Sequence, residues 1–275
     1  MAWLQVSYFS KLLMRTMPLN VLLPDSASHE APVRTLYLLN GFKGDTTEFL
    51  LNTDVMGMMH IYRTAIVMPS GENSAYVNQK GSGWNYGDYV GKELVEVTRR
   101  MLPLSAKRED TAIGGLSMGG YGALIAALRF PETFGYVIAM SGGFLGPESA
   151  VDETSIRRFR NFYGSPQNWD TCEGNPEYLA KQCKASGAEL PKLYLSCGYN
   201  DEYVVKNRAY HHFLESIEFP HVYEEGRGSH EWAFWRWSLP RGLDFCGWKH
   251  ESGYKNPAWV ELRDERYLPA DGTGE

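Results

Sequence analysis

The chain has 275 residues, a hydrophobic fraction of 43% and a formal net charge of −6. This length and composition suit a single α/β domain with a sizeable core. The negative charge, with no run of Lys and Arg longer than a pair, argues against nucleic acid and anionic membrane surfaces as partners. No apolar run reaches transmembrane length, and residues 1–20 lack the pattern of a signal peptide, so we expect a soluble cytoplasmic protein.

Short apolar runs recur along the chain and predict strands. The runs at 5–10 and 17–24 predict two N-terminal strands joined by a turn. Several later runs are apolar throughout, which is typical of strands buried on both faces of a parallel sheet. These later runs span 34–40, 64–69, 111–116, 135–142, 192–198 and 221–226.

Helical patterns lie between the predicted strands. In 88–102, apolar residues recur at helical spacing at Val90, Leu94, Val97 and Met101. The segment 118–130 has little charge and is predicted to pack on the sheet, and 204–217 is a third helix candidate. The alternation predicts an α/β fold with a mostly parallel central sheet and helices on both faces.

Two segments depart from this alternation. Residues from about 145 to 190 are polar and only partly helical, which indicates a small cap inserted over one edge of the sheet. Residues from about 240 to 275 show little periodicity and are interpreted as a C-terminal extension. We therefore expect one domain over 1–275 that carries a cap and an extension.

A glycine-rich stretch after the strand at 111–116 carries the first chemical signal. Residues 115–119 read Gly-Leu-Ser-Met-Gly and match G-x-S-x-G between a predicted strand and a predicted helix. In such a turn the serine hydroxyl is exposed as a nucleophile, and small residues on either side prevent clashes. Ser117 is therefore the candidate nucleophile. The alternative is a glycine-rich turn with an incidental serine.

A serine nucleophile needs a base, and the base needs an orienting acid. In α/β folds of this kind the chain order is Ser, Asp or Glu, then His. Asp201 follows the strand at 192–198, and His230 lies in a Gly/Ser-rich loop after the last strand. Glu202 is the nearest competitor for the acid. The other histidines are interpreted as surface or packing residues: His29, His60, His211, His212, His221 and His250.

Acyl transfer also requires donors for the developing oxyanion. The residue after the nucleophile supplies one backbone N–H, here that of Met118. The second is expected from the loop after an early strand, where Asn40-Gly41 begins a glycine-containing turn. We select the N–H of Phe42 for this role. An ordinary β-turn is the alternative interpretation.

Several segments together resemble the esterase D-like branch of the α/β-hydrolases. This group includes S-formylglutathione hydrolases, tributyrin esterases, and feruloyl and acetyl-xylan esterases. The matching segments span most of residues 6–237 in family order and include "LLNGFKGDTTEFL", "IGGLSMGGYGALIAALRFPETFG", "SGGF", "CGYNDEYVVKNRAYHHFL" and "GSHEWAFW". Together they are far more specific than G-x-S-x-G alone.

The resemblance implies an α/β-hydrolase fold and assigns the same residues to the site. Ser117 matches the nucleophile, Asp201 the acid and His230 the base, while Phe42 and Met118 match the oxyanion donors. Asn40 is a departure, because many relatives carry His before the glycine of this loop. The C-terminal extension is longer than the resemblance implies, and it is a candidate oligomer arm or a candidate cover over part of the site.

The sequence therefore predicts a serine carboxylesterase that hydrolyses short-chain acyl esters, from acetyl to butyryl, without a metal or organic cofactor. The alternatives are an acyltransferase or an S-formylglutathione thioesterase with the same triad, a feruloyl or acetyl-xylan esterase, and a non-catalytic binding protein. The expected partner is a small-molecule ester, with an acylated plant saccharide and a homo-oligomer kept open.

Aromatic residues in two segments are expected to wall a small substrate pocket. The cap carries some of them, and the loop at 73–89 carries others. Bulky walls on both sides would leave space for a short acyl chain only. The selected substrate-binding residues are Trp84, Tyr86, Phe162, Trp169 and Trp232, and the neighbouring aromatics Tyr76, Phe159 and Tyr163 are further wall candidates. The alternative is that these aromatics merely pack the cap.

Overall fold

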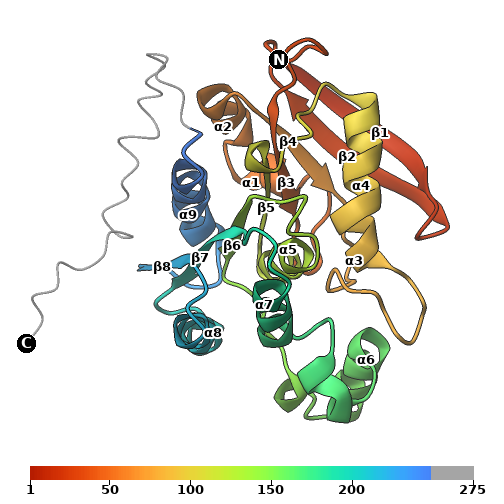
Figure 1. The fold of residues 1–275 in the computed structure, drawn as a ribbon, viewed down its shortest axis with the longest axis vertical. Helices are drawn as coiled ribbons and strands as arrows, with labels where there is room; N and C mark the ends of the chain where they lie inside the picture. Colours follow the sequence, from red (N-terminus) through yellow and green to blue (C-terminus); the bar gives the residue numbers. More distant parts are fainter. Residues whose placement is uncertain (249–275) are drawn as a thin grey trace, which may run out of the picture.

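The computed structural model describes residues 1–248 and contains one eight-stranded sheet with the order β1-β2-β4-β3-β5-β6-β7-β8 (Figure 1). β1 and β2 form an antiparallel hairpin, and β2 joins β4 antiparallel. All strands from β3 to β8 run parallel. The strands span Ala2–Ser10, Arg15–Leu23, Arg34–Leu39, Thr64–Pro69, Thr111–Leu116, Tyr136–Met140, Lys192–Gly198 and His221–Gly226.

This topology confirms the predicted, mostly parallel α/β fold. Every predicted strand is present with bounds shifted by a few residues. β4 and β5 are buried along their whole length, as a continuous apolar run predicts for strands covered on both faces. β1 alternates between half-buried and exposed residues because only one of its faces meets the core.

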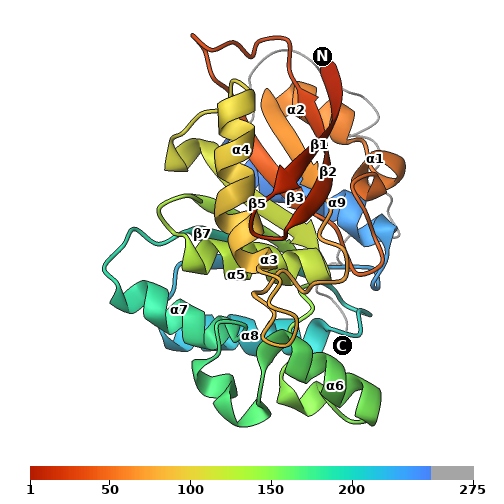
Figure 2. The ribbon, with the colours of Figure 1, turned by 90° about the vertical axis from the view of Figure 1, so that its right-hand side faces the viewer.

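Helices cover both faces of the sheet (Figure 2). α4, α5 and α7 lie on one side and share a hydrophobic core with strand residues such as Tyr37 and Ile113. α1, α2 and α9 lie on the other side, where Met59 and Leu239 belong to a second core. The helices are α1 Glu48–Asn52, α2 Val55–Tyr62, α3 Tyr86–Asp88, α4 Leu94–Met101, α5 Met118–Arg129, α6 Glu153–Tyr163, α7 Pro176–Ala185, α8 Val204–Ser216 and α9 Trp232–Phe245.

The helix predicted over 88–102 forms with one irregularity. A π-helical turn, η1 (Tyr89–Glu93), joins α3 to α4, and Gly91 lies in this turn. A Cβ atom at Gly91 would come within 2.2 Å of the Phe130 ring. The helix thus passes very close to the end of α5 at this point.

α9 was not predicted, and it begins directly after the loop that carries His230. Its buried residues recur at helical spacing: Phe234, Trp235, Ser238, Leu239, Gly242 and Leu243. Pro240 inside this helix obscures the pattern, because proline is normally a helix breaker. The expected extension from about 240 therefore begins within a helix, and its residues 249–275 lie outside the described part of the chain.

The segment expected to form the cap contains α6 and α7 with short 3₁₀ turns at Pro147–Ser149 and Pro166–Thr171. α6 lies at the lower end of the molecule in both views. Its last turn contacts the loop after β4, where Gly81 N–H donates to Asn161 C=O at 2.9 Å. Asp152 is the N-cap of α6 and forms a capping box there with Ser155.

Among residues 1–248, none of the helices has the length and apolar character of a membrane span.

Candidate active site

Ser117 lies in the sharp turn between β5 and α5. Its backbone has φ 54° and ψ −117°, a combination that residues other than glycine rarely adopt. The turn requires small neighbours: a Cβ at Gly115 would come within 2.5 Å of Leu39 C=O, and one at Gly119 within 2.1 Å of the same oxygen. The N–H of Ser117 donates to Met140 C=O at 2.9 Å, which holds the turn against β6.

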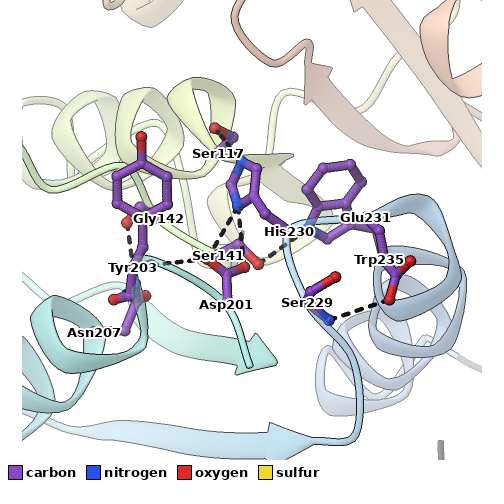
Figure 3. Close-up of polar contacts among 10 residues, drawn as sticks. All are labelled: Ser117, Ser141, Gly142, Asp201, Tyr203, Asn207, Ser229, His230, Glu231 and Trp235. Carbon is purple, nitrogen blue, oxygen red and sulfur yellow. Dashed lines mark hydrogen bonds and ion pairs between the residues drawn. The ribbon is translucent and has the colours of Figure 1, made fainter. Parts of the chain in front are cut away.

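Three side chains from distant parts of the chain meet at this turn (Figure 3). His230 Nε2 lies 2.9 Å from Ser117 Oγ. His230 Nδ1 lies 3.0 and 3.1 Å from the two carboxylate oxygens of Asp201. A carboxylate only accepts hydrogen bonds, so Nδ1 carries the proton and Nε2 is free to accept from the serine hydroxyl. Glu202, the competitor for the acid, points into solvent as an exposed residue.

Asp201 is only 3% exposed and is kept ionised by its partners. Burial by itself raises the pKa of this carboxyl, but hydrogen bonds from His230, the Tyr203 N–H and Ser141 lower it, and the net pKa lies below its ordinary value. The Tyr203 N–H donates to Asp201 Oδ1 at 2.9 Å. The negative charge is therefore present at neutral pH to orient the imidazole and to stabilise its protonated form.

Three residues around the imidazole were not predicted. The rings of Tyr203 and Trp235 each lie 5.0 Å from the His230 ring, so the imidazole is packed between them. Trp235 Nε1 donates to Ser141 Oγ at 3.0 Å. Ser141 itself has a positive φ of 49°, which is uncommon for a residue other than glycine. The helical stripe of α9 is the sequence signal that would have pointed to Trp235.

The two predicted oxyanion donors belong to segments that come close to each other near Ser117. Met118 begins α5, and the first N–H groups of a helix have no partner within the helix. Phe42 lies in the loop after β3, and within the described chain no acceptor receives its N–H. This loop passes close to the nucleophile turn, since a Cβ at Gly41 would come within 2.6 Å of the Leu116 side chain.

The Asn40 side chain holds this loop in place through hydrogen bonds. Its amide nitrogen donates to Gly41 C=O at 2.8 Å and to Gly44 C=O at 3.0 Å. Its side-chain oxygen accepts the Gly71 N–H at 2.8 Å and the Tyr76 hydroxyl at 3.0 Å. The buried Asn40 amide thus donates through its nitrogen and accepts through its oxygen, and these bonds together fix the loop that carries the Phe42 N–H.

Glu48 supports the same loop from α1. Its Oε1 accepts the Gly41 N–H at 3.1 Å. Burial raises the pKa of this carboxyl, the Gly41 N–H lowers it, the charge of Asp45 raises it further, and the result is a pKa of about 7. Glu48 is therefore a carboxyl that changes charge near neutral pH beside the expected oxyanion site.

Several of the predicted pocket residues belong to the hydrophobic core. Tyr76, Tyr86, Phe159 and Tyr163 are buried and packed against other core side chains. Tyr86, for example, is 1% exposed and hydrogen-bonds Glu72 at 2.8 Å. Their burial places these rings in the core, and whether any of them also lines a substrate pocket stays a prediction. These aromatic rings pack between elements, which the sequence alone cannot distinguish from a pocket wall.

The remaining predicted pocket residues retain some exposure. Trp84 is exposed, Phe162 and Trp169 are half-buried within the cap, and Trp232 is half-buried at the start of α9. The Trp169 ring packs at a tilt against Phe159, with centroids 5.6 Å apart, and Trp232 packs against Phe49 and Trp235 with centroid distances of 5.5 and 5.2 Å. α6 contacts the loop that carries Phe42, because the guanidinium carbon of Arg158 lies 5.6 Å from the centroid of the Phe42 ring.

Comparison with known proteins adds the family to this geometry. The family model for esterases matches residues 10–246. The chain belongs to the Esterase family. An acetyl esterase from Caldicellulosiruptor saccharolyticus is 32% identical over 250 residues, which cover 86% of this chain and 94% of the relative. This esterase is thus a serine enzyme that hydrolyses carboxylic esters.

Solved structures agree with this assignment. The fluorophosphonate-binding serine hydrolase F of Staphylococcus aureus is 29% identical, with a TM-score of 0.81 over 89% of this chain and 98% of that one. An S-formylglutathione hydrolase from the same organism is 28% identical, with a TM-score of 0.79 and the same coverage. A ferulic acid esterase, 22% identical over 89% of this chain and 97% of that one with a TM-score of 0.73, shares the fold. The α/β-hydrolase fold and the esterase D-like resemblance are both confirmed.

Proposed function

We propose that this esterase hydrolyses short-chain acyl esters through a triad of Ser117, His230 and Asp201. The observation that carries the proposal is the continuous hydrogen-bonded chain from Ser117 Oγ through the imidazole to the Asp201 carboxylate. The strained backbone of Ser117 supports the nucleophile assignment, because such strain persists where surrounding structure requires it. A non-catalytic protein would have no need to keep this arrangement.

In the proposed mechanism Ser117 Oγ attacks the ester carbonyl carbon while His230 Nε2 takes the hydroxyl proton. The carbonyl oxygen becomes an oxyanion and accepts the N–H groups of Phe42 and Met118, each typically contributing about 3 kcal/mol to barrier lowering. The tetrahedral intermediate collapses, and the leaving alcohol takes the proton from His230. An acyl group remains on Ser117.

Deacylation repeats these steps with water as the nucleophile. His230 takes a proton from the water as it attacks the acyl carbon, and it then returns that proton to Ser117 Oγ as the acid leaves. Asp201 remains ionised throughout and stabilises the imidazolium in both halves of the reaction. If an alcohol or thiol takes the place of water, the same residues catalyse acyl transfer.

A short acyl chain is favoured by the enclosure of the nucleophile. Ser117 is only 9% exposed, so neighbouring residues enclose most of its surface. The acetyl esterase relative supports the same preference. The S-formylglutathione hydrolase neighbour supports a thioester of similar size as the second candidate substrate.

A panel of p-nitrophenyl esters tests the substrate proposal. We expect kcat/KM to be highest for acetate or butyrate and to fall steeply towards octanoate, because each methylene that does not fit changes discrimination by about 1–3 kcal/mol. Methyl ferulate, acetylated xylan and S-formylglutathione in the same assay compare the alternatives directly. An optimum at octanoate or longer would contradict the short-chain proposal.

A further inference from the structure

A second polar cluster lies on α8, away from the proposed triad. His211, His212 and Glu215 project from this helix, and the nitrogen and oxygen atoms that they offer as ligands lie within 4.8 Å of one another. His221, the first residue of β8, lies behind them, with Nε2 2.7 Å from His211 Nδ1. The proposed ester chemistry uses none of these residues.

The hydrogen bonds of this cluster determine the tautomers of two histidines. His221 Nδ1 lies 2.8 Å from Phe219 C=O, which only accepts, so Nδ1 carries the proton. In the neutral ring, His221 Nε2 is then an acceptor, and His211 Nδ1 donates to it at 2.7 Å. His211 Nε2 is therefore left with a free lone pair.

This lone pair faces a carboxylate. His211 Nε2 lies 3.7 Å from Glu215 Oε1, and the two residues are one helical turn apart. Two electron-rich atoms at this distance gain energy only if a proton or a cation lies near both.

The environment keeps the His211 ring in place. It stacks on Tyr223 with ring centroids 4.7 Å apart and an angle of 19° between the planes. The Tyr223 hydroxyl donates to Glu225 at 2.7 Å, and Arg208 pairs with the same carboxylate. His211 Nδ1 donates to His221 Nε2. A metal-binding histidine usually donates its second ring N–H to a neighbouring acceptor in the same way, which fixes both its tautomer and its orientation.

We propose that His211 Nε2, Glu215 and His212 bind a divalent transition-metal ion of the Zn²⁺ type. Imidazole and carboxylate ligands suit Zn²⁺, Ni²⁺ and Cu²⁺ better than Mg²⁺ or Ca²⁺, which prefer oxygen ligands. His212 Nδ1 now lies 3.0 Å from Glu215 Oε2, and its side chain is 72% exposed. It joins the site by moving its ring proton to Nε2, so that Nδ1 presents a lone pair, and water completes the coordination.

Such an ion would stabilise a defined part of the fold. α8 follows the loop that carries Asp201, and β8 precedes the loop that carries His230. The ligands lie on α8, while the His211–His221 hydrogen bond connects them to β8. Metal binding to the folded state alone raises stability in proportion to the logarithm of ion concentration over Kd. The ester chemistry itself proceeds without the ion.

Isothermal titration calorimetry of the tag-free, EDTA-treated full chain with Zn²⁺ at pH 7.5 tests the site. We expect one ion per chain with a micromolar Kd, no comparable binding of Mg²⁺ or Ca²⁺, and a higher Tm with Zn²⁺. His211→Gln and Glu215→Gln should each weaken binding at least tenfold. His60→Gln, which changes an exposed histidine on α2, is the matched control and should bind as the wild type does.

One further variant separates the ligands from the residue that supports them. His221→Phe removes no proposed ligand but frees the His211 tautomer, so we expect affinity to fall roughly 10- to 100-fold with the stoichiometry unchanged. Esterase activity without metal should be normal in all these variants, which shows that they are folded. Wild-type affinity in His211→Gln, or no binding at 100-fold excess of Zn²⁺ over about 10 μM protein, would overturn the proposal.

Discussion

At the scale of single residues, the proposed chemistry depends on which histidine can take a proton from Ser117. His230 meets this requirement through its position, since one ring nitrogen faces the serine and the other faces an ionised carboxylate. His211 has a similar pair of ring contacts, but its partners are another histidine and a surface glutamate. Two histidines with related hydrogen-bond patterns thus have separate proposed roles.

Substitution of the histidines distinguishes these roles. His230→Ala should lose nearly all activity, because the serine then has no base, whereas His211→Ala and His212→Ala should stay close to wild type. Steady-state hydrolysis of p-nitrophenyl acetate measures the difference.

An inactive His211 variant with an intact fold would contradict the assignment of the base. Circular dichroism and the Tm of each variant establish that the fold is intact. The His212 variant serves as the neighbouring control, because its side chain is exposed.

At the scale of elements, the loop from Asn40 to Gly44 connects β3 to the proposed oxyanion site. Its geometry depends on side chains from other elements, since Gly71 and Tyr76 contact the Asn40 side chain and Glu48 accepts the Gly41 N–H. The contacts of Gly71 and Tyr76 could not be predicted, because these two residues lie far from the loop in the sequence and no pattern relates them to it.

Asn40→Asp tests whether the hydrogen bonds of the Asn40 side chain position the loop. An aspartate keeps the size and the acceptor but cannot donate to Gly41 C=O or Gly44 C=O. If the loop is displaced by a fraction of an ångström, the hydrogen bond from the Phe42 N–H to the substrate oxygen weakens. This loss is larger in the transition state, where the oxygen carries negative charge, than in the ground state. We therefore expect kcat to fall roughly 10- to 100-fold with little change in KM.

The control for this variant is Asn168→Asp, an amide-to-carboxylate change at an exposed residue of the cap. Asn40→His, which introduces the residue of many relatives, should retain more activity than Asn40→Asp. A normal kcat in folded Asn40→Asp would contradict the positioning role.

Glu48 makes a separate prediction about stability and pH. Its folded-state pKa of about 7 lies above the ordinary value of 4.5, so the folded protein disfavours the ionised form. The contribution of the Glu48 carboxyl to the free energy of unfolding should therefore decrease as pH rises from about 4.5 to about 7 and then stay constant. Glu48→Gln keeps the acceptor for the Gly41 N–H but removes the charge.

The free energy of unfolding of Glu48→Gln relative to wild type should consequently increase across this pH range. Urea unfolding at several pH values measures it. Glu96→Gln, at an exposed position on α4, is the control. A difference between Glu48→Gln and wild type that does not change with pH would show that the carboxyl is not perturbed by burial.

At the scale of the whole molecule, local sequence patterns predicted the sheet well and the helices less well. Continuous apolar runs such as β4 and β5 are recognisable because both faces of a parallel strand are buried. α9 was missed because Pro240 interrupts its stripe, and α1 is too short to show a period. Chain order and turn chemistry therefore predicted more of this molecule than helical periodicity did.

Part of the candidate site could likewise be predicted from the sequence, and part could not. Ser117, Asp201 and His230 could be selected because each follows a strand of a parallel sheet, and the carboxyl ends of such strands meet at one edge. The aromatic residues could not be sorted, because burial depends on packing partners. Tyr86 and Phe159 are core residues, while Trp84 in the same kind of segment is exposed.

The central claim is that Ser117 is the nucleophile, and the kcat/KM of Ser117→Ala for p-nitrophenyl acetate tests it most directly. The substitution removes one oxygen at a buried turn, so the circular dichroism spectrum should match that of the wild type. The account predicts a loss of about 10⁴-fold or more, with the residual rate coming from substrate binding and the oxyanion donors. A folded Ser117→Ala protein that retains a tenth of the wild-type kcat/KM would contradict it.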